Sequence, residues 1–225
     1  MWCVPKLDED YIAAMEDVLA TYEKPYDPLE PVVCLDEKPV TLHADTRPTT
    51  LAKPGRATRR DYEYTRNGTA NAFCAVQPKA PRFLTWITPR RSGFYFALTL
   101  LELAMAYPEA VTIHLILDNL NTHRRKSLVD AFGEVMANQV WARFTIHYTP
   151  KHGSWLNQAE IAISLLSRQC LGNRRIPDIA TLRREVRFWT RKSNRNNVTI
   201  KWTFDRKAAR KTFGYKSKRI KRSKH

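Results

Sequence analysis

The sequence contains few cysteines, and their spacing does not suit a metal or disulfide framework. The four cysteines among 225 residues stand far apart and include no pair in a CxxC motif: Cys3, Cys34, Cys74 and Cys170. Zinc sites and disulfide scaffolds are therefore poorly supported, and a reducing, cytoplasmic location fits best. Cys34 lies within an apolar run and is most simply a small core residue.

Long apolar runs are also missing. No run approaches the roughly 18 residues that a helix needs to span a bilayer. The first ten residues, MWCVPKLDED, have neither the basic segment nor the apolar segment of a secretory signal. We therefore expect no membrane partner. With 43% hydrophobic residues, the chain can form one large domain, or one domain with extensions.

Acidic residues are scarce relative to basic ones. The chain has 22 Asp and Glu against 38 Lys and Arg, a formal charge of +16, and a pI near 9.9. This excess favours a polyanionic partner, nucleic acid before membrane, because no basic amphipathic helix stands out. From Lys201 to the end there are eleven basic residues and one acid, Asp205. That segment is either a solvated tail or a phosphate-contacting surface.

A second basic segment lies between Pro39 and Gly68. Arginines, among them Arg56, Arg59 and Arg60, are interleaved there with tyrosines. Arginine together with aromatic side chains suits phosphate contact and base stacking. An ordinary solvated hairpin loop explains the same composition equally well.

The predicted elements are typical of an α/β fold. Strands are expected at Val32–Asp36, Thr69–Gln77, Arg82–Thr88, Val111–Leu117 and Arg143–Tyr148. Helices are expected at Asp8–Tyr22, Ser92–Ala106, Thr122–Gln139 and Asn157–Cys170, with one more beginning at Asp178. Ile200, Trp202 and Phe204 alternate like a strand. The order predicts a mixed five-stranded sheet flanked by helices.

Acidic residues follow two of the predicted strands. Asp118 comes after Val111–Leu117, and Asp36 with Glu37 follows the apolar run from Val32. If these strands are parallel neighbours, their carboxylates meet at one edge of the sheet. Glu160 borders the buried face of a later helix. Each acid alone has a structural explanation, as a cap or a surface residue. Together, three carboxylates suit Mg²⁺, and two such ions support phosphodiester displacement.

The longer segments around these acids resemble a known family. VVCLDEKPV, LDNLNTH and HYTPKHGSWLNQAEI are similar to the three acidic blocks of mariner-superfamily transposases, above all the bacterial insertion-sequence branch of the IS-six-thirty type. LSRQCLGNRRIPD, TLRREV and DYEYTRNGT resemble the same branch. The resemblance runs from Trp2 to about Phe213.

The resemblance implies a ribonuclease-H-like fold with an acidic triad, Asp36, Asp118 and Glu160. These three residues would be catalytic and would bind two Mg²⁺ or Mn²⁺ ions. It also divides the chain into a lead-in helix and linker (1–30), a catalytic core (31–195) and a basic C-terminal extension (196–225).

Several other residues are expected around the triad or on the DNA. Glu37 points to the other face of its strand and would support Asp36 from behind. Asn119, Asn121 and His123 would orient Asp118 or contact DNA, and His152 with Trp155 would shape the rim. The mid-strand His114 is expected to be a core or interface residue. The arginines Arg56, Arg59 and Arg60 are further candidates for DNA contact.

The implied activity is metal-dependent DNA cleavage and strand transfer that moves an insertion sequence. The implied partner is double-stranded DNA, both element ends and a target containing TA, bound by a homodimer at the bacterial nucleoid. Relatives carry helix-turn-helix units before the core, so we expect a separately encoded part to supply them. Two alternatives stay open, namely a structure-selective nuclease of the same fold and a catalytically idle, DNA-binding or inhibitory fragment.

Overall fold

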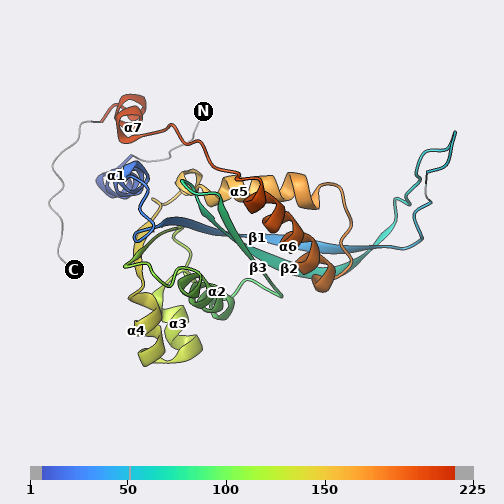
Figure 1. Cartoon of the computed structure of the whole chain (residues 1–225), viewed down its shortest axis with the longest axis horizontal. Coiled ribbons are helices and arrows are strands. Elements are labelled where there is room, and N and C mark those ends of the chain that lie inside the picture. The colour runs from blue at the N-terminus through green and yellow to red at the C-terminus, as the bar shows by residue number, and fades with distance from the viewer. Residues whose placement is uncertain (1–6, 51, 216–225) are drawn as a thin grey trace.

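The computed structural model describes residues 7–50 and 52–215. Its centre is a mixed sheet of five strands in the order β3-β2-β1-β4-β5, of which β1, β2 and β3 are labelled in Figure 1. The strands are β1 (Val32–Asp45), β2 (Tyr64–Gln77), β3 (Arg82–Thr88), β4 (Ile113–Leu117) and β5 (Phe144–Tyr148). The first three are antiparallel neighbours, whereas β4 runs parallel to both β1 and β5. The predicted fold class is confirmed.

Helices cover both faces of this sheet. They are α1 (Glu9–Glu23), α2 (Gly93–Met105), α3 (Arg125–Phe132), α4 (Glu134–Trp141), α5 (Ala159–Leu166), α6 (Ile179–Arg195) and α7 (Arg206–Phe213). One core joins α1, α5, α6 and α7 to one face, and a second core joins α2, α3 and α4 to the other. All five residues of β4 are buried, because the strand lies between these layers. No helix in the described ranges is long and apolar enough to cross a membrane.

The first strand is much longer than predicted. It continues through Asp36 to Asp45, and its pairing with β2 extends to Asp45 opposite Tyr64. The expectation that the strand ends at Asp36 is therefore wrong. β4 ends at Leu117 and leaves β1 as a sheet edge beyond Asp36, where Pro39 is tolerated. The result is a long hairpin that projects from the sheet (Figure 1).

Two other expectations also fail. The helix predicted over Thr122–Gln139 is divided into α3 and α4 at Gly133, whose φ of 78° favours glycine. Ile200, Trp202 and Phe204 form no strand. Their side chains pack on the first core instead, and Asp205 then caps α7 by accepting a hydrogen bond from the Ala208 N–H. The basic residues of 216–225 lie outside the described residues, so the predicted role of that tail stays a prediction.

Candidate active site

The sheet brings Asp36 and Asp118 to the same edge. The parallel pairing of β1 with β4 sets Cys34 opposite Ile116. β4 ends at Leu117, so Asp118 directly follows it, and Asp36 lies two residues beyond the last residue of β1 that pairs with β4. Side chains alternate along a strand, so Asp36 lies on the same face as Cys34, which belongs to the α5 side of the sheet. Two carboxylates therefore reach one edge of the sheet from adjacent strands.

Asn157 connects this edge to the third predicted carboxylate. Its buried side chain donates a hydrogen bond from Nδ2 to the Leu35 carbonyl at 2.9 Å and accepts one at Oδ1 from the Ala159 N–H at 3.1 Å. The first contact reaches the residue before Asp36, and the second lies at the start of α5. Glu160, in the first turn of α5, is held beside Asp36 in this way. The sequence prediction missed Asn157, although it lies three residues before Glu160 in the distinctive third block.

The pKa of Asp36 shows that the carboxylates of Asp118 and Glu160 lie near it. Burial, together with the negative charges of Glu37, Asp118 and Glu160, raises the pKa of Asp36 to about 7. The hydrogen bond that its Oδ1 accepts from the Glu37 N–H (2.7 Å) opposes this rise. Glu160 itself is exposed, and the Asp118 side chain is 24% exposed. The edge thus combines one partly buried carboxyl with two carboxylates that solvent reaches.

His123 lies behind this edge, between Asp118 and Glu37. Its Nδ1 is 2.5 Å from Asp118 Oδ1, and its Nε2 is 3.1 Å from Glu37 Oε2. The ring stacks on Phe96 with centroids 4.6 Å apart. Burial alone lowers the pKa of His123, but the two carboxylates outweigh burial and raise it to about 9. The imidazole is therefore positively charged at neutral pH and offsets both acids.

The three carboxylates suit a hard divalent cation by their chemistry. Carboxylate oxygens are the ligands that Mg²⁺ takes from proteins, and a cation would relieve the mutual repulsion that raises the pKa of Asp36. No group of three or more His, Cys, Asp and Glu side chains within 7–50 and 52–215 is arranged to hold a metal ion, however. Asp118 Oδ1 contacts His123 instead. The acids are neighbours whose charges interact, without a shared coordination sphere.

Comparison with known sequences assigns the family. The sequence pattern described as DDE superfamily endonuclease matches residues 31–183, about two thirds of the chain. The chain belongs to this family of DDE endonucleases. The matched range contains Asp36, Asp118 and Glu160. None of the curated proteins compared with the chain matches its sequence.

Solved structures with a similar fold are complexes of the Mos1 mariner transposase. A paired-end complex with Mn superposes with a TM-score of 0.55 at 13% identity, covering 85% of this chain and 58% of the other. A paired-end complex with the left transposon end has a TM-score of 0.56 at 13% identity, covering 85% of this chain and 57% of the other. The strand transfer complex has a TM-score of 0.55 at 14% identity, again covering 85% of this chain and 57% of the other. The present chain spans under three fifths of those chains, and the likeness establishes the ribonuclease-H-like fold.

The other predicted residues of this DDE endonuclease occupy different places. Asn119 is exposed and donates from Nδ2 to the Thr149 carbonyl at 2.6 Å, and Asn121 is exposed in the turn before His123. His152, with φ of 62°, lines a cavity of about 590 Å³ together with Asn119 and the start of α1. Trp155 packs against the rings of Phe204 and Phe213 and donates to Tyr11 Oη. These contacts show Trp155 joining α1 to α7, and a role at the rim stays a prediction.

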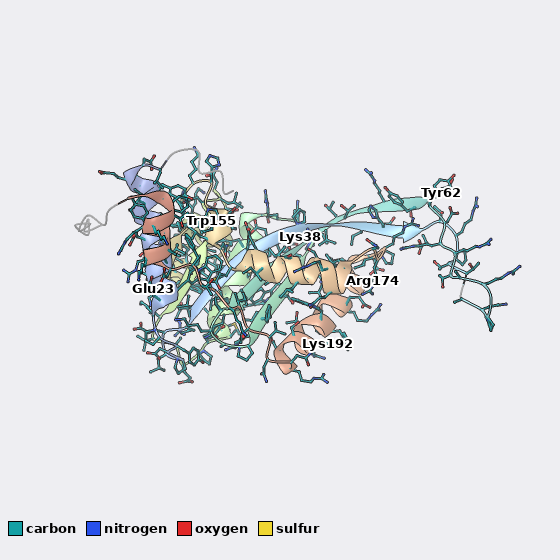
Figure 2. The ribbon with its side chains drawn as sticks, turned by 90° about the horizontal axis from the view of Figure 1, so that it is seen from above. Glu23, Lys38, Tyr62, Trp155, Arg174 and Lys192 are labelled. Atoms are coloured by element: carbon teal, nitrogen blue, oxygen red, sulfur yellow. The ribbon has the colours of Figure 1, made fainter. Side chains whose placement is uncertain are left out.

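The three predicted arginines lie in the hairpin segment between β1 and β2. Arg56 and Arg59 are exposed. Arg60 makes contacts within the chain: its Nε forms an ion pair with Asp45 Oδ1 at 2.9 Å, and its Nη1 donates a hydrogen bond to the Asn173 carbonyl at 3.1 Å. Figure 2 shows Tyr62, in the same segment, at the opposite end of the molecule from Trp155. These arginines therefore do not form part of the carboxylate edge.

His114 is buried in a polar network. Its Nδ1 lies 2.9 Å from Nε2 of His147, whose Nδ1 lies 2.6 Å from Asp17 Oδ2 on α1. Lys24 Nζ is 2.8 Å from the other nitrogen of His114. Burial lowers the pKa of His114. The network fastens α1 to β4 and β5, and His114 is a core residue as expected.

Proposed function

We propose that this DDE endonuclease is the catalytic part of a mariner-superfamily DNA transposase of the bacterial insertion-sequence branch. The observation that carries the proposal is the proximity of three carboxylates: the charges of Asp118, which directly follows β4, and of Glu160, which Asn157 ties to β1, both raise the pKa of Asp36 on β1. An enzyme that acts on DNA also needs basic surface, and the net charge of +16 supplies it.

In this proposal Asp36, Asp118 and Glu160 hold two Mg²⁺ or Mn²⁺ ions. When bound, such ions would activate the attacking oxygen and stabilise the leaving oxygen of a phosphodiester. His123 positions Asp118 and balances its charge, while Glu37 fixes His123 from the other face of the sheet. Partners that orient a metal-binding side chain contribute measurably to activity in other metal sites. The reaction would be DNA nicking followed by attack of a 3′-hydroxyl on target DNA.

The proposed partners are double-stranded element ends and a target containing TA, engaged by a homodimer at the bacterial nucleoid. A separately encoded helix-turn-helix part would recognise the ends. The Mos1 structures of the same fold, a paired-end complex and a strand transfer complex, support this choice. The exposed Arg56 and Arg59 support DNA contact by the hairpin.

A cleavage and joining assay tests the proposal. The purified chain, incubated with Mn²⁺ and a supercoiled plasmid carrying candidate element ends, should nick DNA and join end oligonucleotides to the plasmid. Glu160→Gln and Asp118→Asn should reduce both products to background. Glu160 is exposed, so its substitution should leave the fold intact. Asp130→Asn, which changes another exposed acid on α3, serves as the matched control and should retain activity.

The assay also separates the alternatives. Nicking without joining, lost in Glu160→Gln, would support a nuclease of the same fold. DNA binding without any product, even when helix-turn-helix units are added in trans, would support an idle fragment. Full activity in Glu160→Gln would remove the triad assignment altogether.

A further inference from the structure

A groove runs along the free edge of β3, on the opposite side of the sheet from β4 and β5. It has a volume of about 570 Å³, within the range of ligand sites. Residues of β3 form its floor, while α6 and α2 line it from the two faces of the sheet. β1 and β2 separate β3 from β4. The groove is thus distinct from the carboxylate edge.

The α6 wall of this groove is cationic. Arg183, Arg187 and Arg191 line it at intervals of four residues, which places one guanidinium on each successive turn. They extend over about 12 Å of helix. One strand of DNA at B-form rise presents three to four phosphates, roughly, in that length. No ion pair with a described residue involves Arg187 or Arg191, so their charges are available to a ligand.

The α2 side of the groove is aromatic. Trp86 of β3 and Tyr95 of α2 are only partly buried, and both line the groove. Glu102 of α2 accepts a hydrogen bond from Trp86 Nε1 at 2.5 Å. A carboxylate would repel phosphate on this wall, but it accepts hydrogen bonds from base amino groups. Phosphates are therefore favoured on one wall and bases on the other.

The edge of β3 is poorly suited to a peptide strand. Asn194 of α6 accepts from the Phe83 N–H at 2.7 Å and donates to the Phe83 carbonyl at 3.0 Å. Arg183 Nε donates to the Ile87 carbonyl at 3.2 Å. These side chains occupy backbone groups that an added strand would need. The groove consequently favours a ligand that is recognised by charge and stacking.

We propose that this groove binds a short segment of single-stranded DNA, with phosphates along Arg183, Arg187 and Arg191 and bases against Trp86 and Tyr95. A cationic groove beside aromatic side chains is the general arrangement by which proteins bind single strands without sequence preference. The site is independent of the carboxylates, so binding needs neither metal nor catalysis.

The test is fluorescence anisotropy of a labelled oligo(dT) of about 20 nucleotides, in EDTA and at several salt concentrations. Arg187→Gln/Arg191→Gln should weaken binding and make the slope of log K against log salt less steep by about 1.4, since each single-strand phosphate contact contributes about 0.7. Lys126→Gln/Lys207→Gln removes two exposed lysines of α3 and α7 and should leave the slope unchanged. Trp86→Leu should weaken oligo(dT) binding about 5-fold or more, with the slope retained.

A duplex of the same length and a polyglutamate peptide are measured in parallel. If the arginine pair changes only the duplex slope, and Trp86→Leu changes nothing, the groove holds double-stranded DNA and the proposal fails. Competition by polyglutamate that depends on the arginine pair would identify an acidic peptide instead. Because Arg187 and Arg191 are exposed, their substitution should not unfold the chain, and an unchanged oligo(dT) slope in that variant also overturns the proposal.

Discussion

The imidazole of His123 lies between two carboxylates, that of Asp118, which directly follows β4, and that of Glu37 on β1. The ring and the Glu37 side chain are each 1% exposed, so neither charge is shared with solvent. Arg91 adds a weaker contact, with Nη1 3.7 Å from Glu37 Oε1. Asp118 therefore has one oxygen fixed by a buried cation, which sets the orientation of a carboxylate proposed to bind metal.

A double-mutant cycle tests this bridge. His123→Ala should destabilise the fold by about 3–5 kcal/mol, because it leaves a buried carboxylate without its partner. His123→Ala/Glu37→Gln should cost clearly less than the sum of the two single changes, since the second change removes the charge that the first leaves uncompensated. Urea unfolding of the four proteins measures the difference. Additive costs would mean that the two side chains are not coupled.

The pH dependence of stability should report the burial of Asp36 and the negative charges beside it. Its pKa lies at about 7 in the folded chain against an ordinary value of 3.8, so the folded chain holds this proton more tightly than the unfolded chain. The corresponding stability is present below about pH 4 and is lost as pH rises through about 7. The pKa of His123 is raised from 6.5 to about 9, so its contribution to the free energy of unfolding is present below about pH 6.5 and is lost as pH rises through about 9.

Asp36→Asn isolates this effect. Wild type should lose stability relative to Asp36→Asn between about pH 4 and 7, as measured by urea unfolding at closely spaced pH values. The two proteins share every other titrating group, so their difference belongs to Asp36 and the groups it interacts with. A difference that stays constant over this range would show that the pKa of Asp36 is not raised by burial and neighbouring carboxylates.

Arg175 should control the order of the long hairpin. Its guanidinium contacts Asp45 Oδ1 at 2.6 Å and donates to the carbonyls of Asp61, Tyr62 and Glu63 at 2.7–3.0 Å. It also lies over the Tyr64 ring at 5.1 Å. Lysine keeps the charge but not the fork of donors, so Arg175→Lys should speed hydrogen exchange and proteolysis in residues 45–64 without changing global stability much. Arg184→Lys, on exposed α6, is the control; equal protection in both variants would contradict the role of Arg175.

Much of the fold follows from local patterns in the sequence. The apolar run ending at Leu117 and the helix after Asp178 occur as predicted, because β4 is buried on both faces and Asp178 caps α6 by accepting from the Thr181 N–H. The length of β1 was not predictable from Pro39, since tolerance of that proline depends on where β4 ends. Trp202 and Phe204 alternate like strand residues, yet they serve packing on α1 and the Trp155 loop.

In the candidate site, too, some features follow from local sequence and others depend on tertiary contacts. The sequence singles out Asp36, Asp118 and Glu160 because each lies in a distinctive acidic block, and their joint role as the site stays a prediction. Asn157 and the bridge from His123 to Glu37 depend on contacts across the sheet and on the path of the turn after Asp118. Local sequence does not determine such contacts.

The most direct test of the central claim is Mn²⁺ binding followed by electron paramagnetic resonance, without DNA. Wild type should bind Mn²⁺, and Asp36→Asn, Asp118→Asn and Glu160→Gln should each lose that binding, because all three carboxylates are proposed to supply ligands. Asp130→Asn should bind as wild type does. Equal Mn²⁺ binding by wild type and all three triad variants, or none by any of them at millimolar Mn²⁺, would contradict the assignment of these carboxylates as the metal site.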